Sequence, residues 1–93
     1  MSGINTETAL RLLKTRLNRL PADTTLDEML EARIDAAVKE LEGIGIKLQD
    51  TADDLMLVVD SAAWAYSNRD QATGMPEWLR IRRRERWLRE RDT

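Results

Sequence analysis

Residues 51–70 read TADDLMLVVDSAAWAYSNRD, and this stretch decides the fold. It is apolar on nearly every side of a helical wheel, a pattern typical of a helix that others cover on several faces. Thr51 and Asp54 open it with a capping pattern, and its early carboxylates suit the positive end of the helix dipole. We predict a central helix over 51–70. The side chains expected in the core are Leu55, Val58, Val59, Ala62 and Tyr66, with Leu30, Ile34, Val38 and Trp78 as neighbours.

Two helices are predicted before this one. Leucines spaced three and four residues apart predict a helix over 6–19, which Pro21 should end because proline disfavours a helical residue before it. A second helix is predicted over 25–42. Its capping box would be formed by Thr25 and Glu28, and its C-cap, which tolerates a positive φ, by Gly43.

The segment 44–50, IGIKLQD, alternates apolar and other residues, and we predict a structured loop that buries the apolar ones. Pro76 suits the first turn of a final helix over 76–91. The face of that helix expected to reach the core carries Trp78, Ile81 and Leu88. Together these patterns predict an all-α fold: one small domain, 1–93, of about four helices around the buried central helix.

The composition excludes most chemistry. The 93 residues contain no Cys and no His, which removes disulfides, thiolate nucleophiles, His-based acid–base catalysis and ordinary zinc sites. Ser61 therefore has no base to activate it. The sequence shows neither a secretory signal nor an apolar run of about 20 residues that could cross a bilayer. We expect an intracellular protein that is not an enzyme and needs no cofactor, metal or small-molecule substrate.

Acidic residues cluster around the start of the central helix, at Asp50, Asp53, Asp54 and Asp60. They lack the alternating ligands, the central glycine and the distal glutamate of an EF-hand. We interpret them as helix-capping and solvated surface groups. The Gly43–Gly45 stretch is likewise too short for a phosphate-binding loop.

The net charge of −2 hides an uneven distribution, because residues 1–20 and 77–93 are basic and residues 21–62 are acidic. The final stretch, WLRIRRRERWLRER, carries seven arginines around its circumference and no lysine. Arginine is favoured for pairing with carboxylate or phosphate and for stacking on aromatic rings. The helix is therefore either an interface or a nucleic-acid-facing helix, or else a solvated helix crossed by ion pairs to Glu85 and Glu90.

Trp87 lies about 180° from Trp78 on this helix, so the two cannot easily share a core. Tryptophan and arginine are the residues most enriched in binding hot spots. We expect a partner interface, facing another subunit, at Arg80, Arg83, Arg84, Trp87 and Arg91. The alternative is that Trp87 packs on the helix over 6–19, near Leu12.

The order of these features resembles the small helical head–tail connector (head-completion) proteins of tailed bacteriophages and prophages. The likeness covers about residues 25–91, and it is carried by Tyr66, Arg69, Asp70, Met75, Pro76, Trp78, Leu79 and Arg80. It implies a virion structural protein that assembles as a homo-oligomeric ring under the portal protein and contacts tail-completion proteins. Such a protein is assembled in the host bacterial cytoplasm and surrounds DNA at the head–tail junction.

Two other function classes remain. One is a small DNA-binding or packaging accessory protein that uses the arginine-rich helix, although the acidic residues elsewhere oppose tight DNA binding. The other is a generic intracellular helical adaptor. A salt titration separates DNA binding from the rest, because phosphate contacts weaken steeply as salt rises.

Overall fold

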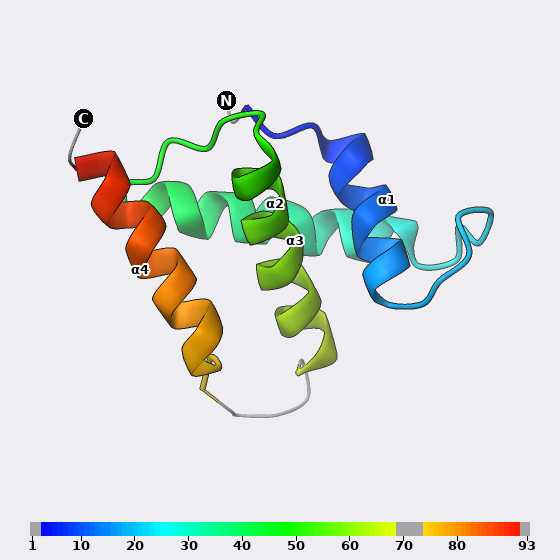
Figure 1. The fold of residues 1–93 in the computed structure, drawn as a ribbon. Coiled ribbons are helices and arrows are strands. Elements are labelled where there is room, and N and C mark those ends of the chain that lie inside the picture. The colour runs from blue at the N-terminus through cyan, green and yellow to red at the C-terminus, as the bar shows by residue number, and fades with distance from the viewer. Residues whose placement is uncertain (1–2, 69–73, 92–93) are drawn as a thin grey trace.

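The chain folds into four helices. The computed structural model describes residues 3–68 and 74–91, and in this part of the chain it contains helices and no strand. The helices are α1 (Thr6–Arg16), α2 (Asp27–Gly43), α3 (Ala52–Ser67) and α4 (Glu77–Arg91). α3 packs against each of the other three, and it lies between α1 and α4 with α2 crossing behind (Figure 1). The predicted all-α fold is confirmed.

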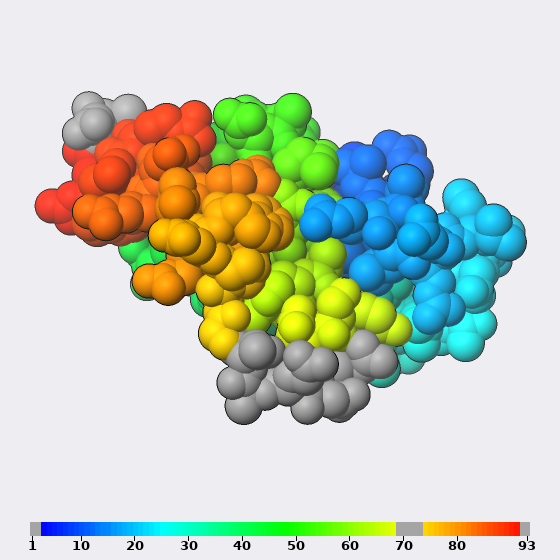
Figure 2. All heavy atoms as spheres, turned by 60° about the horizontal axis from the view of Figure 1, so that its bottom comes forward, coloured from blue at the N-terminus to red at the C-terminus, as the bar shows by residue number. Residues whose placement is uncertain are grey.

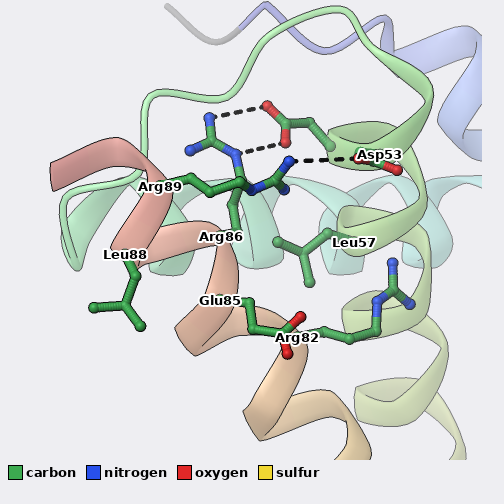
Figure 3. Close-up of a pocket in the computed structure, with 8 residues that line it drawn as sticks. Asp53, Leu57, Arg82, Glu85, Arg86, Leu88 and Arg89 are labelled. Carbon is green, nitrogen blue, oxygen red and sulfur yellow. Dashed lines mark hydrogen bonds and ion pairs between the residues drawn. The ribbon is translucent and has the colours of Figure 1, made fainter. Parts of the chain in front are cut away.

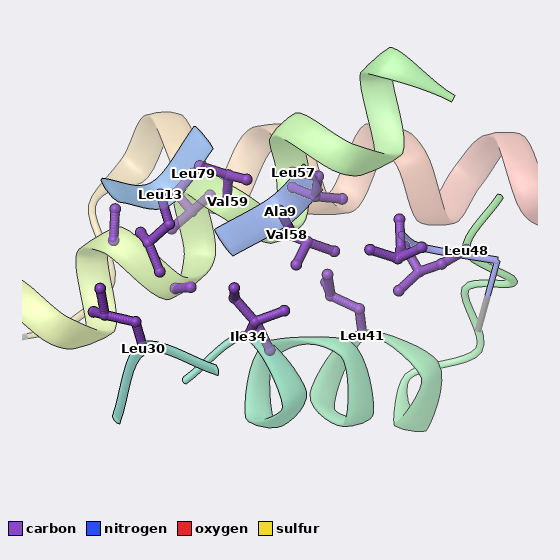
Figure 4. Close-up of a cluster of buried hydrophobic side chains, with 14 of the residues drawn as sticks. Ala9, Leu13, Leu30, Ile34, Leu41, Leu48, Leu57, Val58, Val59 and Leu79 are labelled. Atoms are coloured by element: carbon purple, nitrogen blue, oxygen red, sulfur yellow. The ribbon is translucent and has the colours of Figure 1, made fainter. Parts of the chain in front are cut away.

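The core lies where α1, α2 and α3 meet (Figure 4). The predicted core residues that are buried are Val58, Val59, Ala62, Leu30 and Ile34. Leu55, Tyr66 and the predicted neighbour Val38 are partly buried and pack against the edge of the cluster. Only Trp78 was predicted wrongly, because it is 45% exposed. α1 supplies Ala9 and Leu13 instead, both fully buried.

α4 is rotated relative to the prediction. Trp78, Ile81 and Leu88, which were expected to reach the core, point outward and are 45%, 48% and 44% exposed. The buried residues of α4 are Leu79 and Arg86. On its inward face, α4 adds Leu79 to the hydrophobic core and pairs Arg82 and Arg86 with carboxylates of α3.

The first two helices differ from prediction at their ends. α1 stops at Arg16, three residues before the predicted end, because Asn18 adopts a left-handed conformation with φ 59° that terminates the helix. α2 begins at Asp27, and no side chain caps it. The predicted capping box at Thr25 is wrong: Thr25 lies before the helix, where its amide donates to Asp23 Oδ1 at 3.0 Å.

The ends of α3 and α4 lie closer to prediction. Thr51 caps α3 as expected, with its hydroxyl accepting a hydrogen bond from the Asp54 amide at 3.3 Å. α3 ends at Ser67, and the last two residues of the predicted helix, 69 and 70, lie outside the described residues. α4 begins at Glu77, directly after Pro76.

The loop between α2 and α3 buries two of its three apolar side chains. Ile46 and Leu48 are buried, as predicted, whereas Ile44 is 45% exposed. Gly43 is the last residue of α2 and Ile44 is its C-cap, so the predicted C-cap is wrong by one residue. Gly45 has the positive φ, at 102°, and a Cβ at Gly45 would lie 3.6 Å from Trp87 Nε1. The loop therefore lies directly beside α4.

Candidate functional site

The inward face of α4 is held by a buried ion pair. Arg86 donates to Asp54 at the start of α3, with 2.7 Å from Nε to Oδ1 and 3.2 Å from Nη2 to Oδ2 (Figure 3). The two residues are only 9% and 3% exposed. Arg86 also donates to the Lys47 carbonyl at 2.8 Å, and the Gln49 amide donates to Asp54 at 2.8 Å. One guanidinium thus joins α3, α4 and the loop between α2 and α3.

These contacts favour the charged forms of both side chains. Burial by itself raises the pKa of Asp54, but the hydrogen bonds from Arg86 and the Gln49 amide outweigh it and leave that pKa below its ordinary value. Asp54 and then Glu90 raise the pKa of Arg86 above its ordinary value. The pair therefore remains ionised at neutral pH, and the attraction between its charges contributes to the stability of the folded state.

A second buried carboxylate joins three helices. Asp60 of α3 is 5% exposed and pairs with Arg16 of α1 and Arg82 of α4. Asp54 and Asp60 were both interpreted as capping or solvated groups, and the structure shows that this is wrong. Asp50 and Asp53 are exposed, as interpreted. Buried carboxylates on a central helix need partners, and α4 supplies them.

The five residues of the predicted interface lie together. Arg80, Arg83, Arg84 and Trp87 line one hollow, whose other walls are Glu40, Ile44 and Met75. Arg91 places its guanidinium carbon 4.9 Å from the centroid of the Trp87 ring. Ile44 and Met75 had no sequence signal as neighbours of this group. The contact between Ile44 and α4 depends on where the α2–α3 loop turns.

The same five residues differ in the contacts that they make within the chain. Arg83 pairs with Glu40 and lies 3.3 Å from the Met75 sulfur. Trp87 is half-buried beside Gly45, so the alternative that it packs on the helix over 6–19 is wrong. Arg80 and Arg84 are exposed, and neither forms an ion pair with any of the described residues.

The outward half of α4 carries both apolar and basic side chains. In the space-filling view α4 occupies one end of the visible face, and α1 with the loop after it occupies the other (Figure 2). Three large apolar residues on α4, Trp78, Ile81 and Leu88, are each more than two-fifths exposed. Scattered exposed apolar residues are ordinary, but these three lie on one side of one helix. Trp78 also borders a hollow beside Leu17 and Trp64.

The described residues hold no cluster of metal ligands. Across 3–68 and 74–91, no group of three or more His, Cys, Asp or Glu side chains is placed to hold a metal ion. Ser61 is buried, and its hydroxyl has no hydrogen-bond partner among these residues.

Comparison with protein-family models, with curated proteins and with solved structures finds no match for this chain. None of its described helices is long and apolar enough to cross a membrane. Of the residues that carry the family resemblance, Arg69 and Asp70 lie outside the described residues. Tyr66 lies in the last turn of α3, Met75 lies just before α4, and Trp78 lies in the first turn of α4.

The stability that Asp54 contributes should depend on pH. Its pKa is lower in the folded chain than in the unfolded one, where aspartate titrates at about 3.9. The contribution is therefore fully present above that pH and is lost as the pH falls through the folded-state pKa. We expect Asp54→Asn to destabilise the protein at neutral pH, by an amount that shrinks toward about pH 3.

Urea unfolding of wild type and variant over this pH range measures the difference. Asp50→Asn is the matched control, because Asp50 is exposed and has no ion pair among the described residues. It should unfold like wild type at every pH. A destabilisation by Asp54→Asn that stays constant from neutral to acid pH would contradict the assignment.

Proposed function

We propose that this chain is a head–tail connector subunit of a tailed bacteriophage or prophage. It assembles as a homo-oligomeric ring under the portal protein, joins the DNA-filled head to the tail-completion proteins, and catalyses no reaction. The resemblance over residues 25–91 supports the proposal, and so does a small all-α domain with large apolar side chains exposed on its last helix. Its place is then the virion, at the head–tail junction.

The observation that carries the proposal is the outward face of α4. Trp78, Ile81 and Leu88 are exposed on one side of α4, and covering that side with a neighbour is favourable because it removes apolar surface from water. Burying a large apolar side chain contributes about 1.5–3 kcal/mol relative to leaving it exposed. A subunit in a ring has such a neighbour permanently.

The inward face of α4 supports the same function. Arginines at positions 82, 83, 86 and 89 pair with carboxylates of α2 and α3, so α4 is held at several points along its length. An assembly that must close into a ring needs its contact helix in one fixed orientation. The planar fork of arginine suits this role better than the flexible ammonium of lysine.

The DNA-binding alternative is less well supported. Those four of the seven arginines of α4 already pair within the chain, which leaves fewer cations for phosphate. DNA affinity depends on the number of phosphates that a protein neutralises. The exposed residues Arg80, Arg84 and Arg91 could contact a DNA phosphate backbone, but they lie beside the apolar face of α4.

Replacing an apolar residue of the outward face should prevent assembly without unfolding the subunit. We expect Ile81→Asp to abolish ring formation and attachment to a purified phage portal protein. Its melting temperature should stay near that of wild type, because Ile81 is 48% exposed. Solution mass and negative-stain electron microscopy, each with and without the portal protein, provide the measurement.

The matched control is Met56→Asp, the same chemical change at a residue of α3 that is 38% exposed. It should assemble like wild type. A wild-type chain that stays monomeric at every concentration and does not bind the portal protein would rule out the connector function. Steeply salt-dependent binding to duplex DNA in that experiment would favour the alternative.

A further inference from the structure

The outer surface of α2 carries a narrow row of carboxylates. We name it the acidic stripe, and it consists of Glu28, Glu31, Asp35 and Glu42. At 100° per residue these four lie within about 60° of one another around the helix. All four are exposed, and none forms an ion pair with another described residue. The exposed Lys39 lies about 20° from Glu28 on the same face, but the four carboxylates outnumber this one cation, so a further cationic partner would stabilise the row.

The arginine-rich helix of the same chain cannot neutralise this stripe. α4 meets α2 through Arg83, which pairs with Glu40, and through the hollow that includes Ile44. Glu40 and Ile44 lie about 150° or more around α2 from the centre of the acidic stripe. The stripe therefore faces away from α4 and toward whatever lies outside the monomer.

The outward half of α4 carries a complementary row. We name it the basic stripe, and it consists of Arg80, Arg84 and Arg91, which lie within about 40° of one another. All three are exposed and unpaired with any carboxylate of the described residues. Their spacing of four and then seven residues is also the spacing of Glu31, Asp35 and Glu42 in the acidic stripe.

We propose that the basic stripe of one copy binds the acidic stripe on α2 of a second copy. The inference rests on the proposed function in one respect, that copies of this chain meet. With the helices parallel, the shared spacing lets Arg80 face Glu31, Arg84 face Asp35 and Arg91 face Glu42. Three charge pairs then form in one register.

The contact gives direction to the assembly. Two different patches meet, so each copy keeps one free basic stripe or one free acidic stripe until the chain of copies closes. Head-to-tail contacts of this kind generate rings when the rotation between copies closes, and filaments when it does not. The charge pairs set register and partner choice, and the adjacent Ile81 and Leu88 contribute apolar area.

A charge exchange tests the contact. Arg84→Glu and Asp35→Arg should each weaken self-association by about tenfold or more, because each places like charges opposite one another. Mixing the two variants should restore assembly, since the new carboxylate in the basic stripe of the first then faces the new guanidinium in the acidic stripe of the second. The other stripe of each variant stays native. Arg11→Glu, the same charge change at an exposed residue of α1, should assemble like wild type.

Sedimentation at low and high salt, with melting curves for each variant, provides the readout. Three results would overturn the contact: wild-type association by Arg84→Glu, failure of the mixture to associate, or a wild-type chain that stays monomeric. The last would leave the connector function standing if the chain still bound the portal protein. Loss of duplex DNA binding by Arg84→Glu with unchanged association would assign the basic stripe to phosphate instead.

Discussion

Replacing Arg86 with alanine is expected to lower the free energy of unfolding by about 3–5 kcal/mol. The guanidinium is almost fully buried and donates to Asp54, to the Lys47 carbonyl and to Glu90. Its removal leaves the Asp54 carboxylate buried without its cation, and an uncompensated buried charge is among the costliest single changes. It also releases α4 from the loop between α2 and α3.

Arg89→Ala is the matched control on the same helix. Arg89 pairs with Asp53 at 3.6 Å, but both side chains are exposed, and pairs of this kind contribute about 0–1 kcal/mol. The double variant Asp54→Ala with Arg86→Ala should lose clearly less free energy of unfolding than the sum of the losses of the two single variants. Urea unfolding of the four variants beside wild type provides the measurement. Equal losses for Arg86→Ala and Arg89→Ala would mean that burial of the pair contributes nothing.

Apolar periodicity was sufficient to predict the four helices and part of the core. The all-round apolar pattern of 51–70 identified the helix that contacts the other three, and it placed Val58, Val59 and Ala62 correctly. Leu30 and Ile34 followed from the amphipathic pattern of α2. These predictions succeed because burial of apolar area is the dominant favourable term in folding. The spacing of apolar residues along a helix, which shows the side that is buried, is visible in the sequence.

The orientation of α4 could not be predicted in that way. Its apolar face suggested that Trp78 pointed inward, yet the helix turns Arg82 and Arg86 toward Asp60 and Asp54. The signal was present, because two carboxylates within a helix covered on several sides require cationic partners. Which of seven arginines would supply them depends on the distance between helices. That distance is a tertiary property, and a single sequence does not state it.

The sequence predicted the helix start that a side chain caps, but it missed a helix end that is set by the backbone conformation. Thr51 caps α3 through its hydroxyl, as its sequence pattern indicated. Gly45 was missed because Gly43 offered the same chemistry two residues earlier. The five residues of the predicted interface lie together in the fold. Arg83 and Trp87 are partly engaged within the chain, whereas the exposed Arg80 and Arg84 stay available to a partner.

Leu30→Ala is expected to cost about 2–5 kcal/mol of the free energy of unfolding, the range for leucine truncation in a packed core. Leu30 is 1% exposed and belongs to the cluster where α1, α2 and α3 meet. The change removes apolar contacts and leaves a cavity that the surrounding helices fill only in part. For a domain whose total stability is about 5–15 kcal/mol, this is a large fraction.

Leu20→Ala supplies the matched control, because the same atoms are removed from a side chain that is 74% exposed. It should change the free energy of unfolding by no more than about 0.5 kcal/mol. Chemical denaturation of the two variants beside wild type gives the comparison, and the difference between them isolates burial from any effect of leucine on the unfolded chain. If both variants unfold at the wild-type denaturant concentration, Leu30 does not lie in the core, and the packing of α2 against α3 has to be revised.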